Sequence, residues 1–212
     1  WFFETNGSYF GCKKGAEPLH IQWNPAEDVI EVVNYSAGEQ SGLTAKVQIM
    51  NMDGQIVWEK ESSVNSYEDS TIKCIKLEYP DGISDVHFFK LYLTKNGTVL
   101  SDNFYINGKE YGNHQALKSI AKADVKTKVA FNKGDDGIWT GTITLENRSN
   151  VPAIMIRLNV VGRKDGEQIL PMFYGDNYFS MMPGEKKTVS LKWYEADTRG
   201  NNPKVKITGY NL

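Results

Sequence analysis

The stretch IEVVNYS at residues 30–36 recurs in form as ITLENRS at residues 143–149. Each copy ends in Asn-x-Ser, and each is followed by a second apolar-alternating run and then by an Asp-Gly pair. Asn34 and Asn147 lie 113 positions apart, and the two Asp-Gly pairs lie 112 apart. A nearly constant offset of this kind indicates a duplicated unit. The sequence therefore predicts two similar domains in tandem, each of about 100 residues.

Both copies carry the pattern of β-structure. Residues 45–49, 154–160 and 189–193 alternate between apolar and polar with the period of a half-buried strand, and a slip in the alternation of residues 72–77 predicts a bulge. About seven strands per copy, with turns at short intervals, indicate an all-β protein of two tandem immunoglobulin-like antiparallel β-sandwiches. The predicted strands are 18–24, 28–35, 43–52, 55–62, 70–79, 86–95 and 98–106, then 124–132, 138–147, 153–163, 167–174, 177–182, 186–194 and 203–211.

The domain limits follow from the break between the two copies. We assign residues 1–108 to the first sandwich, including an N-terminal lead-in segment, and residues 109–212 to the second. Residues 114–120 lack alternation, and we expect a helical turn there.

The turns of the two copies use matched residues. Gly54 and Gly166 close the two Asp-Gly pairs, where we expect a positive φ. Asn34 and Asn147 stand in glycosylation sequons at strand ends. Capping of a turn by the asparagine side chain explains both copies without glycans.

Composition excludes several classes of partner. The 212 residues carry a net charge of −2, and the lysines and arginines are scattered, so we expect no nucleic-acid partner. The sequence lacks a run of eighteen apolar residues, so we expect no membrane span. The chain begins at Trp1-Phe2-Phe3, which suggests either a removed leader or excision from a longer polypeptide.

The chain has two cysteines, Cys12 and Cys74, both in the first copy. A disulfide essential to this kind of domain would recur in the second copy, so we favour two free, largely buried thiols over a bridge. Neither thiol has a histidine placed in the sequence to activate it as a nucleophile.

The sequence lacks the usual signs of catalysis. His20, His87 and His114 do not stand at metal-ligand spacing, and phosphate- and dinucleotide-binding motifs are missing. The acidic pairs at 27–28, 68–69 and 135–136 lie in turns, where solvated carboxylates are common. We therefore predict no catalytic residue, no metal site and no cofactor.

Aromatic residues offer one candidate binding site. Trp193 alternates in register with the apolar residues before it and Trp23 shares a face with Leu19, so we expect both indoles to point inward. Tyr174, Tyr178 and Phe179 lie in or near one turn and are the best candidates for contact with a carbohydrate. A free-standing carbohydrate-binding module is thus an alternative function.

Several motifs resemble one enzyme family. The segment GSYFGCKKGAEPLHIQW, residues 7–23, is similar to a stretch of family 2 glycoside hydrolases of the β-mannosidase and exo-β-D-glucosaminidase type. It departs from their usual sequence at Gly15. In that family the stretch leaves the catalytic barrel and enters the first C-terminal β-sandwich. Further similar segments are SDNFY at 101–105, LEN at 145–147, PA at 152–153, RL at 157–158, ILP at 169–171, DNYF at 176–179 and PGE at 183–185.

The resemblance implies a function for the whole chain. Such enzymes are retaining exo-glycosidases whose two catalytic glutamates project from a barrel, which would lie upstream of Trp1. No residue here matches either catalytic motif. We therefore expect non-catalytic accessory domains that brace the upstream barrel of the same parent chain. A glycan is a further possible partner, and the expected location is the bacterial periplasm or outside the cell.

The same resemblance gives a role to the first aromatic residues. Trp1-Phe2-Phe3 and Tyr9-Phe10 would form an apolar surface that packs on the barrel or on the first sandwich.

Overall fold

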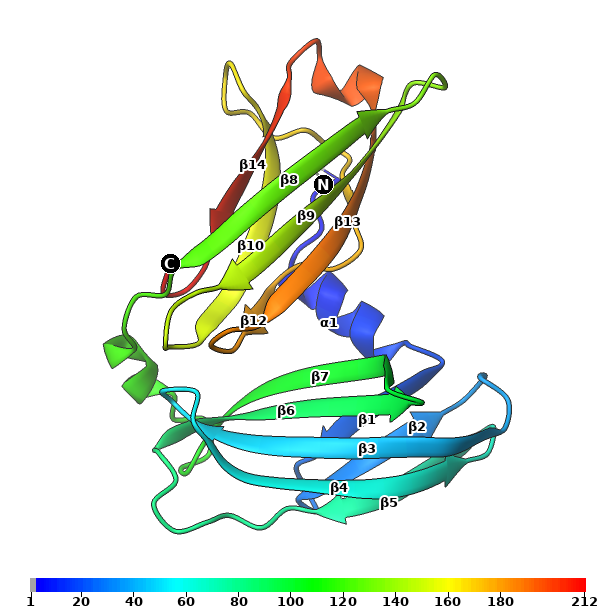
Figure 1. Cartoon of the computed structure of the whole chain (residues 1–212), viewed down its shortest axis with the longest axis vertical. Helices are drawn as coiled ribbons and strands as arrows, with labels where there is room; N and C mark the ends of the chain where they lie inside the picture. The colour runs from blue at the N-terminus through cyan, green and yellow to red at the C-terminus, as the bar shows by residue number, and fades with distance from the viewer. Residues whose placement is uncertain (1–2) are drawn as a thin grey trace. The chain divides into compact units, whose positions relative to one another are not determined.

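A computed structural model describes residues 3–212 of the chain and shows an all-β protein with antiparallel sheets, as predicted (Figure 1). By their contacts the residues divide into two compact units. We call Cys12–Ile120 the N-terminal unit, and we call residues 3–11 together with Ala121–Leu212 the C-terminal unit. Residues 3–11 therefore group with the C-terminal unit, whereas the sequence predicts them in the first domain, residues 1–108. The boundary between residues 108 and 109 stays a prediction.

The N-terminal unit is a sandwich of two antiparallel sheets. One sheet has the strand order β1-β2-β5, and the other has the order β4-β3-β6-β7. Figure 1 shows the second sheet in front of β1 and β2. The strands are β1 (Leu19–Asn24), β2 (Val29–Asn34), β3 (Gln40–Asn51), β4 (Ile56–Ser66), β5 (Ser70–Lys76), β6 (Val86–Lys95) and β7 (Thr98–Gly108).

Alternation along β3 builds the core of the N-terminal unit. Leu43, Ala45, Val47 and Ile49 are fully buried between the sheets, as the period of two requires. The predicted bulge is confirmed on β5, where the pairing with β2 shifts by one residue beside Cys74. The extra residue explains why the alternation of the sequence slips there.

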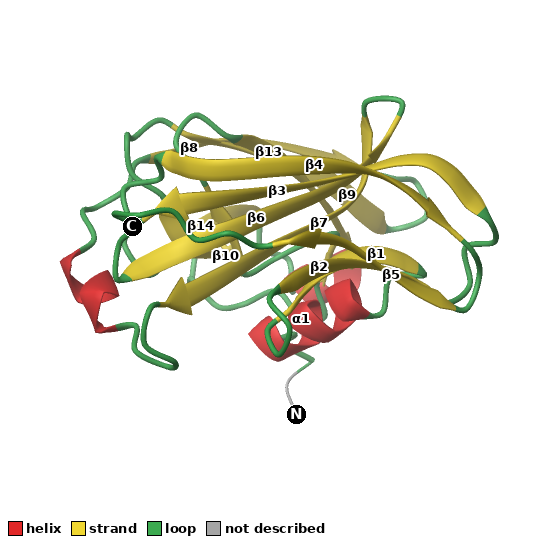
Figure 2. Ribbon diagram, turned by 90° about the horizontal axis from the view of Figure 1, so that it is seen from below, coloured by secondary structure: helices red, strands yellow, loops and turns green. Residues whose placement is uncertain are grey.

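The C-terminal unit is a second sandwich, with sheets ordered β12-β10-β14 and β11-β13-β9-β8. Its core is a separate apolar cluster, and Trp193 is its largest fully buried side chain. Figure 2 shows the strands of both units from a second direction. The strands are β8 (Val125–Lys133), β9 (Ile138–Asn147), β10 (Ala153–Gly162), β11 (Phe173–Tyr174), β12 (Phe179–Met181), β13 (Lys186–Tyr194) and β14 (Pro203–Thr208).

The prediction of a continuous strand over residues 167–174 is wrong. Gln168 forms only an isolated bridge to Val161 on β10, and Phe173–Tyr174 pairs with β13 in the other sheet. The chain changes sheets between these points, in a stretch that contains Pro171, which has no N–H group to donate to a ladder. The predicted strands at 177–182 and 203–211 are also shorter in the structure.

Among residues 3–212, three helical segments complete the fold. The predicted helical turn is confirmed as η1 (Gln115–Ser119), and η2 (Glu195–Thr198) precedes β14. The helix α1 (Gly7–Gly15) was not predicted. The side chain of Asn6 caps it by accepting a hydrogen bond from the backbone N–H of Tyr9 at 3.1 Å.

Candidate functional site

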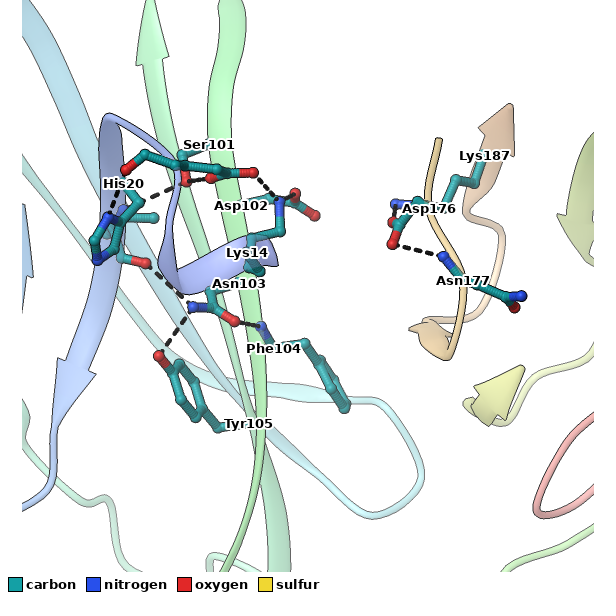
Figure 3. Close-up of polar contacts among 12 residues, drawn as sticks. Lys14, His20, Ser101, Asp102, Asn103, Phe104, Tyr105, Asp176, Asn177 and Lys187 are labelled. Atoms are coloured by element: carbon teal, nitrogen blue, oxygen red, sulfur yellow. Dashed lines mark hydrogen bonds and ion pairs between the residues drawn. The ribbon is translucent and has the colours of Figure 1, made fainter. Parts of the chain in front are cut away.

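Two segments of similar sequence carry connected sets of polar contacts. SDNFY lies on β7 in the N-terminal unit, and DNYF precedes and enters β12 in the C-terminal unit. Each contains an Asp-Asn pair followed by two aromatic residues. Figure 3 shows the aspartate of each pair beside a lysine.

In the N-terminal unit the aspartate of this pair binds the end of helix α1. The Lys14 Nζ donates to Asp102 Oδ1 at 3.0 Å and to Glu17 Oε1 at 2.9 Å (Figure 3). Burial alone would lower the pKa of Lys14, but the charge of Asp102 and the hydrogen bonds to both carboxylates raise this pKa above its ordinary value. The lysine therefore stays charged and ties the lead-in segment to β7.

Glu17 extends the same network toward β1. Its Oε2 accepts a hydrogen bond from Ser101 Oγ at 2.7 Å, and its backbone carbonyl faces His20 Nδ1 at 3.0 Å. His20 is 5% exposed, so it is a packed histidine. The bond between Ser101 and Glu17 joins residues 84 positions apart, and its effect is structural.

Asn103 and Tyr105 join β7 to β1. The Asn103 Nδ2 donates to the Tyr105 hydroxyl at 3.0 Å, and this hydroxyl accepts the backbone N–H of Trp23 at 3.3 Å. Burial raises the pKa of Tyr105, so its hydroxyl stays protonated at neutral pH. The edges of the two sheets are therefore linked through side chains.

Asn177 makes the corresponding link in the C-terminal unit. It is nearly fully buried, its Oδ1 accepts the backbone N–H of Leu158 at 2.7 Å, and its Nδ2 donates to the Leu158 carbonyl at 3.0 Å. The side-chain amide thus pairs with β10 as a strand residue would. Asp176 binds Lys187 at 2.8 Å on β13, so the two residues connect the turn to both sheets (Figure 3).

The structure places the predicted carbohydrate contacts in this turn, with each residue already in contact with the protein. The Tyr174 hydroxyl accepts the backbone N–H of Val160 at 3.0 Å, and burial raises the pKa of Tyr174 to about 12. The ring of Tyr178 lies 6.0 Å from that of Phe10, and the Lys187 Nζ lies 4.9 Å above the ring of Phe179. All three side chains are half-buried, and their contact with a carbohydrate stays a prediction.

Residues 3–11, the start of the lead-in segment, contact the sandwich of the C-terminal unit in two ways. Glu4 Oε1 accepts hydrogen bonds from Arg157 Nη2 and, at 3.2 Å, from Gln168 Nε2. Phe10 is 6% exposed and packs on Tyr178, whereas Phe3 and Tyr9 are exposed. Trp1 and Phe2, which belong to the same predicted apolar surface, lie outside the described residues.

The cysteines are free, as predicted, but only one of them is covered. Cys74 is half-buried, its Sγ lies 3.2 Å from the Ile30 carbonyl, and burial raises its pKa to about 11. The prediction that both thiols are largely buried is wrong for Cys12, which is exposed on helix α1. The error follows from the unpredicted helix, which turns this position toward solvent.

The acidic turn residues act as the sequence indicated. Glu27 forms an ion pair with Lys73 at 2.6 Å on the surface, and Asp136 Oδ1 accepts the backbone N–H of Ile138 at 3.0 Å within its turn. Within residues 3–212, groups of three His, Cys, Asp or Glu side chains that could hold a metal ion are absent. The helices among these residues are also too short or too polar to cross a membrane.

Sequence reasoning missed the pairing of Lys14 with Asp102 and of Asp176 with Lys187. The first pair is separated by 88 positions, and neither charge differs in its sequence context from a solvated surface residue. The capping signal of Asn6, three residues before Tyr9-Phe10, and the lysines at 13 and 14 could have predicted helix α1.

The fold and its motif contacts define a class: tandem immunoglobulin-like domains whose distinctive polar residues hold chain segments together. The family model "Exo-beta-D-glucosaminidase Ig-fold domain" matches residues 103–212, and "Mannosidase Ig/CBM-like domain" matches residues 30–108. The chain belongs to the exo-β-D-glucosaminidase Ig-fold domain family.

Relatives agree with this assignment over the whole chain. The exo-β-D-glucosaminidase of Streptomyces avermitilis is 29% identical over 99% of this chain and 26% of its own length. The mannosylglycoprotein endo-β-mannosidase of Lilium longiflorum is 24% identical over 98% of this chain and 28% of its own length. The crystal structure of the Amycolatopsis orientalis exo-chitosanase CsxA superimposes with a TM-score of 0.92 at 28% identity, covering 99% of this chain and 27% of that one.

These matches fix which part of such glycosidases the chain represents. It spans about a quarter of the length of the curated relatives it matches. The part that it matches is the immunoglobulin-like accessory portion, so the chain corresponds to accessory domains of a glycoside hydrolase.

Proposed function

We propose that this chain is the accessory part of a family 2 retaining exo-β-glycosidase, with exo-β-D-glucosaminidase or β-mannosidase specificity. The observation that carries the proposal is the extent of the similarity. It runs through both sandwiches in one order, yet takes up only about a quarter of the relatives. The remaining three quarters of those proteins leave room for a catalytic barrel in the same polypeptide, which is the partner that we propose.

The contacts of the chain support a bracing role. Both Asp-Asn motifs are occupied by structural bonds: Asp102 holds Lys14, and Asn177 holds the backbone of β10. A segment that is tied down in this way can transmit a fixed geometry to the domain that precedes it. One relative is named an exo-chitosanase, and the large size of a polysaccharide keeps it out of the cytoplasm. We therefore also propose a periplasmic or extracellular location.

The test uses the longer polypeptide that contains this chain, assayed on p-nitrophenyl β-D-glucosaminide and β-mannoside. We expect it to hydrolyse one of the two substrates with retention of configuration. We also expect that removal of residues 12–212 lowers the melting temperature of the remainder. The absence of turnover on both substrates would contradict the proposed specificity, and an unchanged melting temperature would contradict the bracing role.

A further inference from the structure

The N-terminal unit has a cavity at one end of its sandwich. Its volume is about 660 Å³, within the roughly 300–1,000 Å³ range of small-molecule sites. Trp23 at the end of β1, Ile83 before β6 and Ile106 on β7 contribute apolar surface. The rim includes Tyr79 and Tyr111, both exposed. The residues come from three separate stretches, 23–28, 79–87 and 106–114, so the folded unit, and not one loop, forms the cavity.

Three hydrogen bonds fix the polar groups of the cavity. The Tyr79 hydroxyl donates to Asp28 Oδ1 at 2.8 Å. The His87 Nδ1 faces the Ser84 carbonyl at 3.2 Å and therefore carries the proton, so His87 Nε2 accepts from Asn107 Nδ2 at 3.3 Å. These bonds orient the carboxylate of Asp28 and the amide of Asn107 before any ligand arrives.

The same bonds leave acceptors unused. Among the described residues, Asp28 Oδ2 and Asn107 Oδ1 have no hydrogen-bond partner, and both residues line the cavity. The nearby charge of Lys109 is directed to Asp85, 3.6 Å away. A ligand that satisfies this site must bring hydrogen-bond donors, and an anion would meet the Asp28 carboxylate. Aromatic surface beside these acceptors favours a ligand with an apolar face as well.

We propose that this cavity binds a sugar ring of a β-linked amino-sugar oligosaccharide. The ring would place its C–H face against Trp23 and Tyr111 and its hydroxyl and ammonium donors against Asp28 and Asn107. The choice of an amino sugar rests on the proposed function, whereas the cavity and its acceptors stand on the structure alone. The ammonium group also gains from the aromatic rings, because cations bind favourably to their faces. The site is separate from the turn at Tyr174 that the sequence indicated.

The test is calorimetric titration of the 212-residue chain with the fully deacetylated glucosamine trimer, with the N-acetylated trimer as comparison. We expect saturable binding of the deacetylated trimer and weaker binding of the acetylated one. Asp28→Asn should weaken binding about tenfold, since hydrogen bonds to charged groups contribute most. Asp28 has a φ of 51°, which asparagine tolerates, so this variant keeps the fold.

Two exposed tyrosines give a matched pair of variants. Tyr111 is fully exposed on the rim, and Tyr67 is exposed away from the cavity. Tyr111→Ala should weaken binding severalfold, whereas Tyr67→Ala should leave it unchanged. No binding of either trimer at millimolar concentration, or binding that Asp28→Asn and Tyr111→Ala leave intact, would overturn the site. Equal binding of both trimers would overturn the amino-sugar class. Hydrolysis by the longer polypeptide is measured separately, so failure of this site leaves the proposed function standing.

Discussion

Each sandwich has an asparagine turn at the equivalent position, but the two sandwiches differ in one edge strand. In the N-terminal unit Asn34 ends β2 and its amide bonds Gly38 and Ala37; in the C-terminal unit Asn147 ends β9 and bonds three residues. Farther along, β4 runs for 11 residues, whereas the matching segment of the C-terminal unit forms a bridge at Gln168 and the two-residue strand β11. The duplicated asparagine corner therefore tolerates large change at the sheet edge beside it.

Trp193 provides the largest expected difference between the units. Its indole is fully buried, stacks on Trp139 at 5.6 Å and meets Phe131 edge-on at 5.1 Å. Trp193→Ala should destabilise the C-terminal unit by about 3–5 kcal/mol. The half-buried Trp58 on β4 is the matched control, and Trp58→Ala should cost the N-terminal unit clearly less. Urea unfolding followed by hydrogen exchange resolves the two units, and equal losses would show that the second core is not built around this indole.

Replacement of the turn asparagine should also destabilise the C-terminal unit more than the N-terminal unit. Asn147 Nδ2 donates to the carbonyls of Val151 and Met181, and its Oδ1 accepts the N–H of Ser149. Asn147→Ala should cost about 2–4 kcal/mol, because buried backbone groups lose their partners. Asn34→Ala breaks fewer bonds and should cost about 1–3 kcal/mol. A larger loss from Asn34→Ala in the same hydrogen-exchange experiment would contradict this order.

Replacement of the glycine in the Asp-Gly turn should destabilise both units by a similar amount. Gly54 has a φ of 86° and Gly166 a φ of 74°, which confirms the predicted left-handed conformation. A Cβ at Gly166 would meet no atom within 4 Å, so backbone strain alone remains. Gly166→Val should destabilise its unit by about 1–3 kcal/mol, and Gly166→Asn should cost much less. Melting temperatures of the three proteins check this, and an unchanged value for the valine variant would refute it.

Acid should destabilise the N-terminal unit more than the C-terminal unit, and this is the smallest of the expected effects. All three histidines lie in the N-terminal unit. Burial, with the charge of Lys109, lowers the pKa of His87 despite its hydrogen bond to Ser84. The unfolded chain then binds a proton that the folded chain does not, so stability is lost as pH falls below about 6.5.

The measurement is hydrogen exchange between pH 7 and about pH 5.5, above the range of ordinary carboxylates. The N-terminal unit should lose protection over this range, and His87→Gln should reduce the loss. An equal decline of the C-terminal unit, which contains no histidine among its residues, would assign the effect to other groups.

The sequence predicted what depends on local pattern. The apolar alternation of β3, the asparagine corners and the Asp-Gly turns each follow from a few neighbouring residues, and the structure confirms them. The strand over residues 167–174 failed because one proline outweighed its apolar content. Helix α1 failed because its capping signal at Asn6 was not read.

The polar contacts lay beyond prediction for a different reason. Lys14 with Asp102 and Tyr79 with Asp28 depend on which distant strands become neighbours. The cavity beside Trp23 needs three distant stretches of the chain to come together before its acceptors converge. A single sequence carries no signal for such juxtapositions.

The central claim is that these 212 residues supply shape and contact, while bond cleavage happens elsewhere in the parent polypeptide. The most direct measurement is the release of p-nitrophenol from the β-D-glucosaminide and the β-mannoside by the chain on its own. The account predicts release no faster than in buffer. Saturable turnover that disappears when a single carboxylate of the chain is replaced would contradict it.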